Sequence, residues 1–259
     1  MLAAHDLSCR RGGRAILNRV TVSARAGEVT AVIGANGSGK TTLLRHLTGE
    51  MRAESGRVTL DGTDLSAMPP AVLARRRAVL PQAAALGFPF TVAEVVAMGL
   101  QADPAPDPAR IPAALARVDL GGYGARMYRQ LSGGEQARVQ LARVLVQVWN
   151  PVSDADPCWL FLDEPVSALD IAHQLWVTRE ARRFADAGGG VVVVLHDLNL
   201  TAMIADRVIL MDHGRVLAAG SPAEVLTGER LSAAYGCRIE IGGTPPSGPY
   251  VLPQMASLG

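Results

Sequence analysis

Residues 34–41 read GANGSGKT, and this octet decides the fold class of the 259-residue chain. It matches the pattern G-x-x-x-x-G-K-[ST] at every position, between the apolar run GEVTAVI (27–33) and the segment TLLRHLTG (42–49). These two flanks predict a strand and a helix. A strand that leads through a glycine-rich loop into a helix is the context in which this pattern binds phosphate. A glycine-rich turn that contains Gly-Lys-Thr by chance is the alternative, and the flanking elements disfavour it.

The octet has the chemistry that a nucleotide requires. Glycines allow consecutive backbone N–H groups to converge on phosphate oxygens, and the N-terminus of the following helix adds a partial positive charge. Lys40 would reach the β- and γ-phosphates, and the Thr41 hydroxyl would bind magnesium. The dinucleotide pattern G-x-G-x-x-G does not fit, because Asn36 stands at its second glycine. The candidate ATP-binding residues are Gly34, Ala35, Asn36, Gly37, Ser38, Gly39, Lys40, Thr41 and Thr42.

Two more apolar segments, CWLFL (158–162) and VVVVL (191–195), predict strands that are buried on both faces of a parallel sheet. Asp163 and Glu164 directly follow the first segment, at the strand end where ligands bind in open α/β sheets. We expect Asp163 to hold magnesium through water and Glu164 to polarise an attacking water. An exposed acidic strand end is the alternative, which the phosphate-loop pattern disfavours.

The composition excludes several classes of protein. The chain is 49% hydrophobic and 19% charged with a net charge of +1, which indicates a globular protein with a full core. It lacks the basic excess of a nucleic-acid-binding protein, and its 4% aromatic content offers few base-stacking platforms. We therefore expect no nucleic-acid partner.

Three scattered cysteines indicate reduced thiols, and no apolar run approaches the roughly 20 residues of a membrane span. Work at a membrane would require a partner.

The middle of the chain has a different pattern. TVAEVVAMG (91–99) has helical spacing, and residues 101–112 carry four prolines and predict a loop. Residues 111–120 and the segment after Ser132 again have helical spacing. We therefore expect residues 88–148 to form an all-helical subdomain inserted into the α/β core.

The rest of the chain completes one domain, residues 1–259. Residues 1–87 and 149–259 are expected to form the ATP-binding α/β core. Near the end, residues 207–217 predict two short strands about a turn, and a helix is expected from Pro222.

Residues 131–139 read LSGGEQARV. Ser132 and Glu135 have the spacing of a capping box, which by itself accounts for a helix that begins here. The cap does not account for Gly133 and Gly134, since a glycine in a helix interior costs about 1 kcal/mol relative to alanine. Either this is an ordinary cap with a flexible approach, or the bare backbone receives a ligand. Backbone N–H groups at a helix N-terminus suit a phosphate.

Two polar residues carry weaker signals. His196 follows VVVVL, where a histidine alone is more often a hydrogen-bonded strand end than a functional group. Gln82 lies in the predicted loop VLPQAAALGFPF, where a lone glutamine is normally solvated. Both residues become candidates for a functional role because of the other motifs in the chain and the order in which all of them occur.

In this order, GANGSGKT, Gln82, LSGGEQ, LFLDEP, SALD and His196 resemble the nucleotide-binding subunits of ABC transporters, over nearly the whole chain. The resemblance implies a P-loop NTPase fold, with a RecA-like α/β core, a β-rich N-terminal part and the inserted helical subdomain. It implies ATP and Mg2+ as cofactors. It also implies a head-to-tail homodimer that holds two Mg-ATP molecules between its chains.

The resemblance also assigns roles to individual residues. Gln82 would contact the magnesium and sense a transmembrane partner, and His196 would contact the γ-phosphate as a catalytic residue beside Glu164. A signature segment would bind the ATP that the opposite chain holds, and a D-loop would cross to that chain. The signature residues are Ser132, Gly133, Gly134 and Glu135, and the D-loop residues are Ser167, Ala168, Leu169 and Asp170.

The chain departs from the family pattern at two positions. RRGGRAIL places Arg11 where an adenine-stacking aromatic residue is usual. A guanidinium is planar and stacks on π-faces, so Arg11 is a candidate adenine contact. Val166 stands where threonine is usual, and we expect little effect from this change.

Several stretches resemble the ATP-binding proteins of bacterial haemin importers. They are RAVLPQ with FPFTVAEVVAMG, the helix GGEQARVQLARVLVQVW, the extension NPVSDADPCW and the late AAYG segment. This resemblance implies an ATPase that energises haem uptake through a two-subunit transmembrane permease, with a periplasmic haem-binding protein as an indirect partner. It implies a peripheral location on the cytoplasmic face of the bacterial inner membrane.

Two other functions remain open. One is the ATPase of a ferric-siderophore or cobalamin importer, which shares the same layout. The other is a soluble ABC ATPase of DNA repair, translation or iron–sulfur assembly. The single copy of each motif, the absence of a long coiled-coil insertion and the near-neutral charge weigh against the soluble class.

Overall fold

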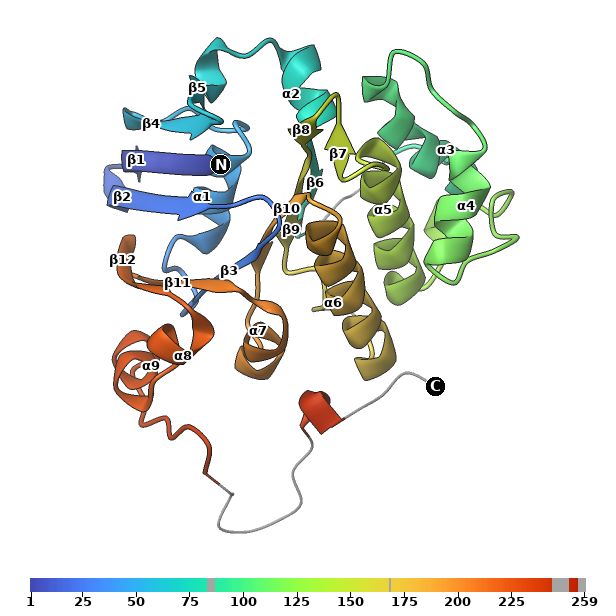
Figure 1. The fold of residues 1–259 in the computed structure, drawn as a ribbon. Helices are drawn as coiled ribbons and strands as arrows, with labels where there is room; N and C mark the ends of the chain where they lie inside the picture. The colour runs from blue at the N-terminus through green and yellow to red at the C-terminus, as the bar shows by residue number, and fades with distance from the viewer. Residues whose placement is uncertain (83–86, 168, 244–251, 256–259) are drawn as a thin grey trace.

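A computed structural model describes residues 1–82, 87–167, 169–243 and 252–255 (Figure 1). The phosphate-loop octet joins β3 (Val29–Gly34) to α1 (Lys40–Leu47), as the sequence predicted. β3 lies inside a six-stranded sheet of order β12-β11-β3-β10-β9-β6. Its other strands are β6 (Arg77–Leu80), β9 (Trp159–Asp163), β10 (Gly190–Val194), β11 (Arg207–Asp212) and β12 (Arg215–Gly220). All neighbours pair in parallel except β11 and β12, so the C-terminal ends of five strands lie at one edge.

The central strands are buried on both faces, which their continuous apolar sequences predicted. Every residue of β3, β9 and β10 is buried. Alternate residues belong to different core clusters: Val191 and Val193 pack in one, and Val192 and Val194 pack in the other. Both faces of the sheet are therefore covered, and polar groups reach the surface only where the strands end.

The N-terminal part is rich in strands, as the fold class implied. β1 (Leu2–Arg11), β2 (Arg14–Ala24), β4 (Ser55–Leu60) and β5 (Thr63–Asp64) form an antiparallel sheet of order β2-β1-β4-β5. The short helices η1 (Leu65–Ala67) and α2 (Pro70–Arg76) follow and lead into β6. α1 contacts β1 and β2 on one side and β3, β9 and β10 on the other, so it lies between the two sheets.

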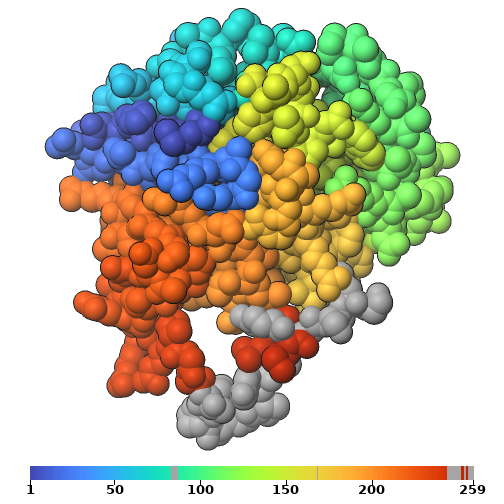
Figure 2. All heavy atoms as spheres, in the orientation of Figure 1, coloured from blue at the N-terminus to red at the C-terminus, as the bar shows by residue number. Residues whose placement is uncertain are grey.

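The region from residue 92 to residue 147 is made of helices. They are α3 (Val92–Ala97), η2 (Met98–Ala102), α4 (Arg110–Arg117), η3 (Tyr128–Gln130) and α5 (Gly133–Gln147). α3, η2 and α4 pack against α5. The space-filling view shows this green region on the opposite side of the molecule from the blue antiparallel sheet (Figure 2).

The predicted loop over residues 101–112 is too long. η2 extends to Ala102, and α4 already begins at Arg110. Pro112 lies in the first turn of α4, where the missing N–H of a proline would have no intrahelical partner. The helix that was predicted over residues 111–120 therefore begins one residue earlier, inside the predicted loop.

The C-terminal third returns to the α/β core. α6 (Ile171–Asp186) and α7 (Leu198–Ile204) follow β9 and β10, and the predicted strand pair over 207–217 is β11 with β12. The predicted helix from Pro222 is α8 (Pro222–Val225), followed by α9 (Gly228–Tyr235) and η4 (Pro253–Met255). The extension before β9 forms a small hairpin of β7 (Val152–Ser153) and β8 (Asp156–Pro157). None of the helices in the described ranges has the length and apolar character that crossing a bilayer requires.

Candidate functional site

The phosphate loop has the backbone shape that its glycines predict. A Cβ atom on Gly34 would lie 2.2 Å from the carbonyl oxygen of Met211, so only glycine fits against β11. Gly39 has a φ of 102°, a conformation that other residues rarely adopt. The octet wraps around the N-terminus of α1, whose unpaired N–H groups favour an anion. This shape is a cradle for phosphate.

Lys40 is held inside the loop. Its Nζ donates to the carbonyl oxygens of Gly34 at 2.8 Å and Ala35 at 3.0 Å, and its side chain is buried. Burial lowers the pKa of Lys40, while the nearby carboxylates of Glu164 and Asp163 raise it in part. A buried ammonium whose hydrogen-bond partners among the described residues are neutral carbonyls favours an anionic ligand.

Thr41 and Asp163 meet beside this lysine, although they are 122 residues apart. The Thr41 Oγ1 donates to Oδ1 of Asp163 at 3.2 Å. Burial raises the pKa of Asp163, and the Thr41 hydrogen bond offsets part of that rise. A hydroxyl and a carboxylate are hard oxygen donors, which suit Mg2+ when phosphates supply further ligands. The described residues contain no group of three His, Cys, Asp or Glu side chains that would hold a metal alone.

Glu164 is the centre of a polar cluster. Gln82 Nε2 donates to its Oε2 at 2.8 Å, and the Nε2 of His196 lies 2.6 Å from its Oε1. Its backbone φ is 52°, a left-handed conformation that is costly for a residue with a side chain. The structure therefore brings together the end of β9, the end of β10 and the segment after β6 at one carboxylate.

The expected D-loop, residues 167–170, begins three residues after Glu164. Ser167 Oγ donates to the carbonyl oxygen of Glu164 at 3.1 Å, and Asp170 caps α6 by accepting from the N–H of His173. Gln174, which the sequence did not single out, donates to the carbonyl oxygens of Val166 and Leu169 at both ends of this turn. Ala168, the fourth expected D-loop residue, lies outside the described residues.

The predicted capping box at the start of α5 is confirmed. The Ser132 Oγ accepts from the N–H of Glu135, and Oε2 of Glu135 accepts from the N–H of Ser132 at 2.8 Å. Gly133 is exposed, and a Cβ atom there would meet nothing within 4 Å. Nothing in its own chain therefore requires a glycine at this position. Gln136, missed in the sequence, donates to the carbonyl oxygens of Tyr128 and Leu131 and fixes the segment before the cap.

The signature segment lies apart from the phosphate loop of the same chain. Figure 1 shows α1 on one side of the six-stranded sheet and α5 on the other. α5 contacts α3, α4, η2 and β6. A phosphate held at Lys40 would therefore lie away from Gly133 of its own chain.

Arg11 lies at the tip of the β1–β2 hairpin, opposite Arg14, and its side chain is exposed. Three residues beyond this pair, β2 passes the phosphate loop, since a Cβ atom on Gly39 would lie 3.0 Å from a methyl carbon of Leu17. The hairpin tip is thus beside the loop, with a cationic side chain and no aromatic ring at its end.

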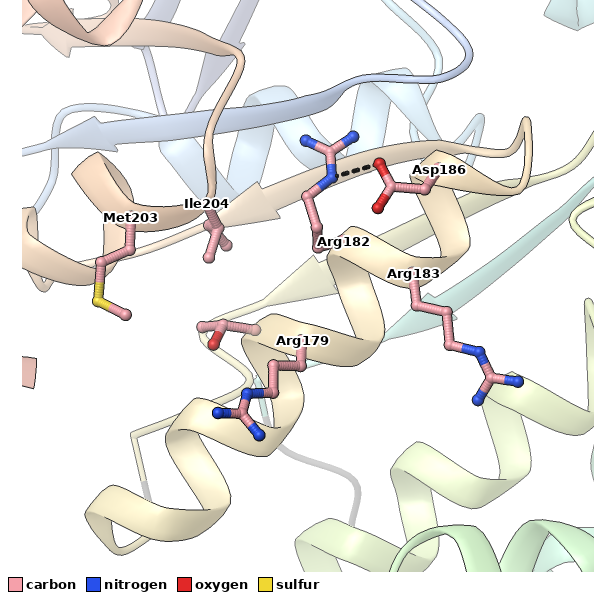
Figure 3. Close-up of a pocket in the computed structure, with 7 residues that line it drawn as sticks. Arg179, Arg182, Arg183, Asp186, Met203 and Ile204 are labelled. Carbon is pink, nitrogen blue, oxygen red and sulfur yellow. Dashed lines mark hydrogen bonds and ion pairs between the residues drawn. The ribbon is translucent and has the colours of Figure 1, made fainter. Parts of the chain in front are cut away.

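A separate hollow of about 350 Å3 lies between α6 and α7 (Figure 3). Arg182, which pairs with Asp186, is one of its lining residues, and Arg179, Arg183 and Met203 also line it. None of its lining residues belongs to the phosphate loop, the carboxylates or the signature, so it is not part of the nucleotide site.

Comparison with known families defines the class of this protein. The profile of the family described as "ABC transporter" matches residues 17–167. This stretch contains the octet, Gln82, the signature segment and both carboxylates. The chain therefore belongs to the ABC transporter family, as one of its ATP-binding domains.

Among curated proteins, the chain is similar to several that are named Hemin import ATP-binding protein HmuV. The relative from Jannaschia sp. (strain CCS1) is 54% identical, over 99% of this chain and 95% of its own length. The relative from Mesorhizobium japonicum is 55% identical, over 98% of both chains. The relative from Ruegeria sp. (strain TM1040) is 56% identical, also over 98% of both.

Solved structures support the same fold. An ATP-binding subunit of an ABC transporter superposes with a TM-score of 0.78 at 23% identity, over 92% of this chain and 95% of that one. A bacterial Atm1-family ABC exporter with ATP bound superposes with a TM-score of 0.75 at 26% identity. That match covers 87% of this chain and 39% of the exporter.

Proposed function

We propose that this chain is the ATP-hydrolysing subunit of a bacterial ABC importer for haem. The observation that carries the proposal is a sequence identity of 54–56%, over almost the full length, to proteins named for hemin import. That similarity accompanies a complete phosphate loop, a buried aspartate and the Glu164 cluster. The ferric-siderophore and cobalamin alternatives lack such support among these relatives.

In this proposal the loop residues 34–42 bind the ATP phosphates. Backbone N–H groups of the loop point at the phosphates, and Lys40 exchanges its two carbonyl partners for β- and γ-phosphate oxygens. Thr41 and Asp163 would hold Mg2+, which neutralises phosphate charge when it is bound. Arg11, at the tip of the β1–β2 hairpin, stacks on the adenine base. Each residue acts from the position in which the fold already holds it.

Glu164 orients and deprotonates the attacking water. Gln82 and His196 hold its two carboxylate oxygens, so the side chain has one orientation before a nucleotide arrives. In this proposal His196, which lies beside this carboxylate, contacts the γ-phosphate. In this proposal Gln82 would contact the metal through its amide oxygen and would couple the state of the site to the permease.

The site is completed by a second copy of the chain. Ser132, Gly133, Gly134 and Glu135 of one copy cover the γ-phosphate bound by the other, and the D-loop of residues 167–170 lies between the copies. The exposed and unobstructed Gly133, apart from its own phosphate loop, supports this head-to-tail arrangement. The two copies close when ATP binds and reopen after hydrolysis. These movements displace the helical subdomain, which we propose spans residues 88–148.

A membrane-embedded permease is the partner that an ABC importer requires, and we place the chain on the cytoplasmic face of the inner membrane. The docking surface is expected just after Gln82, where Phe88 is 75% exposed beside Phe90. Phe90 is partly buried against the core, so it anchors this segment, and the exposed Phe88 ring suits a protein interface. A periplasmic haem-binding protein would act on the opposite side of the permease.

ATPase measurements in proteoliposomes that contain the cognate permease test this function. Haem-loaded binding protein should stimulate ATP hydrolysis, and the apo form of the same protein is the matched control. Stimulation only by a siderophore or cobalamin carrier would move the chain to that cargo class. A rate of ATP hydrolysis that does not change with any carrier protein or with the permease would favour a soluble ABC ATPase.

A further inference from the structure

One side of α5 carries a polar row whose members all bond to other parts of the chain. The row consists of Gln136, Gln140, Arg143 and Gln147, which lie four, three and four residues apart and therefore follow one side of the helix. Their partners lie in the segment before α5, in α2 and in β6, as well as within the row itself. The polar row therefore connects the helix that begins with the signature segment to the α/β core.

The C-terminal half of the row binds β6. This strand lies at one end of the six-stranded sheet and pairs with β9 on one side. On its other side, alternate carbonyl oxygens need donors from outside the sheet. Gln147 Nε2 donates to the carbonyl oxygen of Arg77 at 2.9 Å, and Arg143 Nη2 donates to that of Val79 at 3.3 Å. β6 ends two residues before Gln82, so α5 is attached to the strand that leads into the Glu164 cluster.

The row continues from Arg143 towards the signature segment. Arg143 Nε donates to Oε1 of Gln140 at 2.8 Å, and Gln140 Nε2 donates to the hydroxyl oxygen of Tyr128 at 3.1 Å. Tyr128 is buried, and η3, which it begins, ends two residues before Ser132. A continuous chain of hydrogen bonds therefore runs from β6 through Arg143 to the segment that leads into the signature.

Arg143 is the member of the row that is costly to keep. It is partly buried, its hydrogen-bond partners are neutral oxygens, and it forms no ion pair with a carboxylate of the described residues. Burial lowers the pKa of Arg143. A cation withdrawn from water without a counter-ion is unfavourable, and an apolar side chain of similar length would avoid that cost. η2 also packs here, since a Cβ atom on Gly99 would lie 2.1 Å from the carbonyl oxygen of Arg143.

The position of Arg143 along α5 gives its contacts leverage over the signature segment. Arg143 lies eleven residues after Ser132, which is about 16 Å along a helix that rises 1.5 Å per residue. A tilt of α5 by about 4° at Arg143 would move the start of the helix by about 1 Å over that length. A misplacement of about 1 Å can cost about 10²-fold in the rate of a reaction that depends on positioning.

We propose that Arg143 is a positioning residue for the signature segment: it fixes α5 on β6, so that Ser132 and Gly133 of one copy meet the γ-phosphate held by the opposite copy. Arg143 touches no nucleotide, and the site that it serves is the one on the other chain. Because this role requires a site shared between two copies, it rests on the proposed function.

Mixed dimers test this role, because they separate the two halves of a site. Gly133→Val disables the signature and Lys40→Ala disables the phosphate loop, so a pair of these two variants has one complete site. Arg143→Met is added either to the Lys40→Ala chain, which supplies the signature, or to the Gly133→Val chain, which supplies the phosphate loop. The rate at saturating ATP should fall roughly ten- to hundredfold in the first arrangement and stay within about twofold of the parent pair in the second.

Arg182→Met is the matched control for lost stability. Arg182 also donates from a helix to a backbone carbonyl, that of Gly27 before β3 at 3.1 Å, and it pairs with Asp206. Its replacement should lower the free energy of unfolding in urea and leave the rate at the parent level in both arrangements. Tyr128→Phe removes only the acceptor of Gln140 and keeps the test open if Arg143→Met does not fold. It should lower the rate in the first arrangement alone, by a smaller factor.

Two results would overturn the proposal. One is an equal loss of rate in both arrangements, which is what a merely structural role of Arg143 produces. The other is an unchanged rate when the chain that supplies the signature carries Arg143→Met or, if that variant does not fold, Tyr128→Phe. Failure of the proposed function looks different, since the parent pair of Gly133→Val and Lys40→Ala would then hydrolyse no ATP even with Arg143 intact.

Discussion

At the scale of single residues, Glu164 is constrained both in its backbone and in its side chain. Its backbone is left-handed with a φ of 52°, which costs about 1–2 kcal/mol for a residue other than glycine. Its side chain is nevertheless fixed by Gln82 and His196, which come from other elements. Strained conformations that persist in this way cluster at active sites. Glu164 is therefore the side chain whose substitution is most informative.

Glu164→Gln should bind ATP and form the ATP-dependent dimer but hydrolyse ATP about 10²- to 10⁴-fold more slowly, because the amide cannot accept a proton from water. Phosphate release and size-exclusion chromatography measure the two effects separately. Glu229→Gln, an exposed glutamate on α9, is the matched control and should behave as wild type. Wild-type turnover in Glu164→Gln would exclude Glu164 as the base.

Arg11→Ala should weaken ATP binding about three- to tenfold, the loss expected for one cation–π contact with the base. Arg11→Lys should lose nearly as much, because an ammonium cannot stack as a planar guanidinium does. Binding of inorganic triphosphate, which has no base, provides the control and should not change. Equal ATP affinity of Arg11→Ala and wild type would remove Arg11 from the adenine site.

At the scale of elements, local signals in the sequence predict the structure well. GEVTAVI gives β3, because a continuous apolar run next to a glycine-rich loop has few other conformations. Ser132 and Glu135 form the predicted capping box, since a cap depends only on residues three apart. The short strand β6 (RAVL) escaped prediction, because four residues after an arginine-rich helix carry no clear period.

Non-local geometry is the part that the sequence could not provide. Gln82 and His196 lie 82 and 32 residues from Glu164, and only the parallel strand order brings them to one carboxylate. The family pattern indicated these residues without indicating their contacts.

Capping glutamates give the helices a defined pH dependence. Hydrogen bonds from the backbone and hydroxyl of Thr91, Ser132 and Ser221 lower the pKa of Glu94, Glu135 and Glu224, respectively. An acid whose pKa is lower in the folded state stabilises the fold above its ordinary value of 4.5, and this contribution is lost as the pH falls through the folded-state pKa.

Glu224→Ala tests this dependence outside the nucleotide site. Urea unfolding should show wild type as more stable than the variant at neutral pH, with the gap closing at pH values well below 4.5. A gap that is independent of pH would show that the Glu224 carboxylate does not contribute through its charge.

Gly133→Val should leave the free energy of unfolding within about 0.5 kcal/mol of wild type, because an exposed position with open space around it tolerates a side chain. Binding of one ATP to the isolated chain should also persist. Hydrolysis and ATP-dependent dimerisation should be lost, since the side chain would stand where the opposite phosphate docks. Gly121→Val, another exposed glycine with nothing within 4 Å of its Cβ position, should retain both activities.

At the scale of the whole molecule, the two proposed halves of the ATP site lie apart within one chain. The phosphate loop and the Glu164 cluster lie at the C-terminal edge of the sheet, while the signature segment begins α5 on the other side of that sheet (Figure 1). One chain cannot close both halves around the same nucleotide without large rearrangement. In the proposed head-to-tail pair of chains, each half would lie opposite its complement, and the movement that closes the pair would be available to drive a permease.

Mixing two inactive variants tests this account most directly. Lys40→Ala keeps an intact signature, Gly133→Val keeps an intact phosphate loop, and each alone should hydrolyse almost no ATP. A mixed dimer contains one complete site, made of the Gly133→Val phosphate loop and the Lys40→Ala signature. ATPase activity measured across mixing ratios should therefore rise to a maximum near equal amounts. A mixture with no more activity than the separate variants would contradict a site shared between two copies.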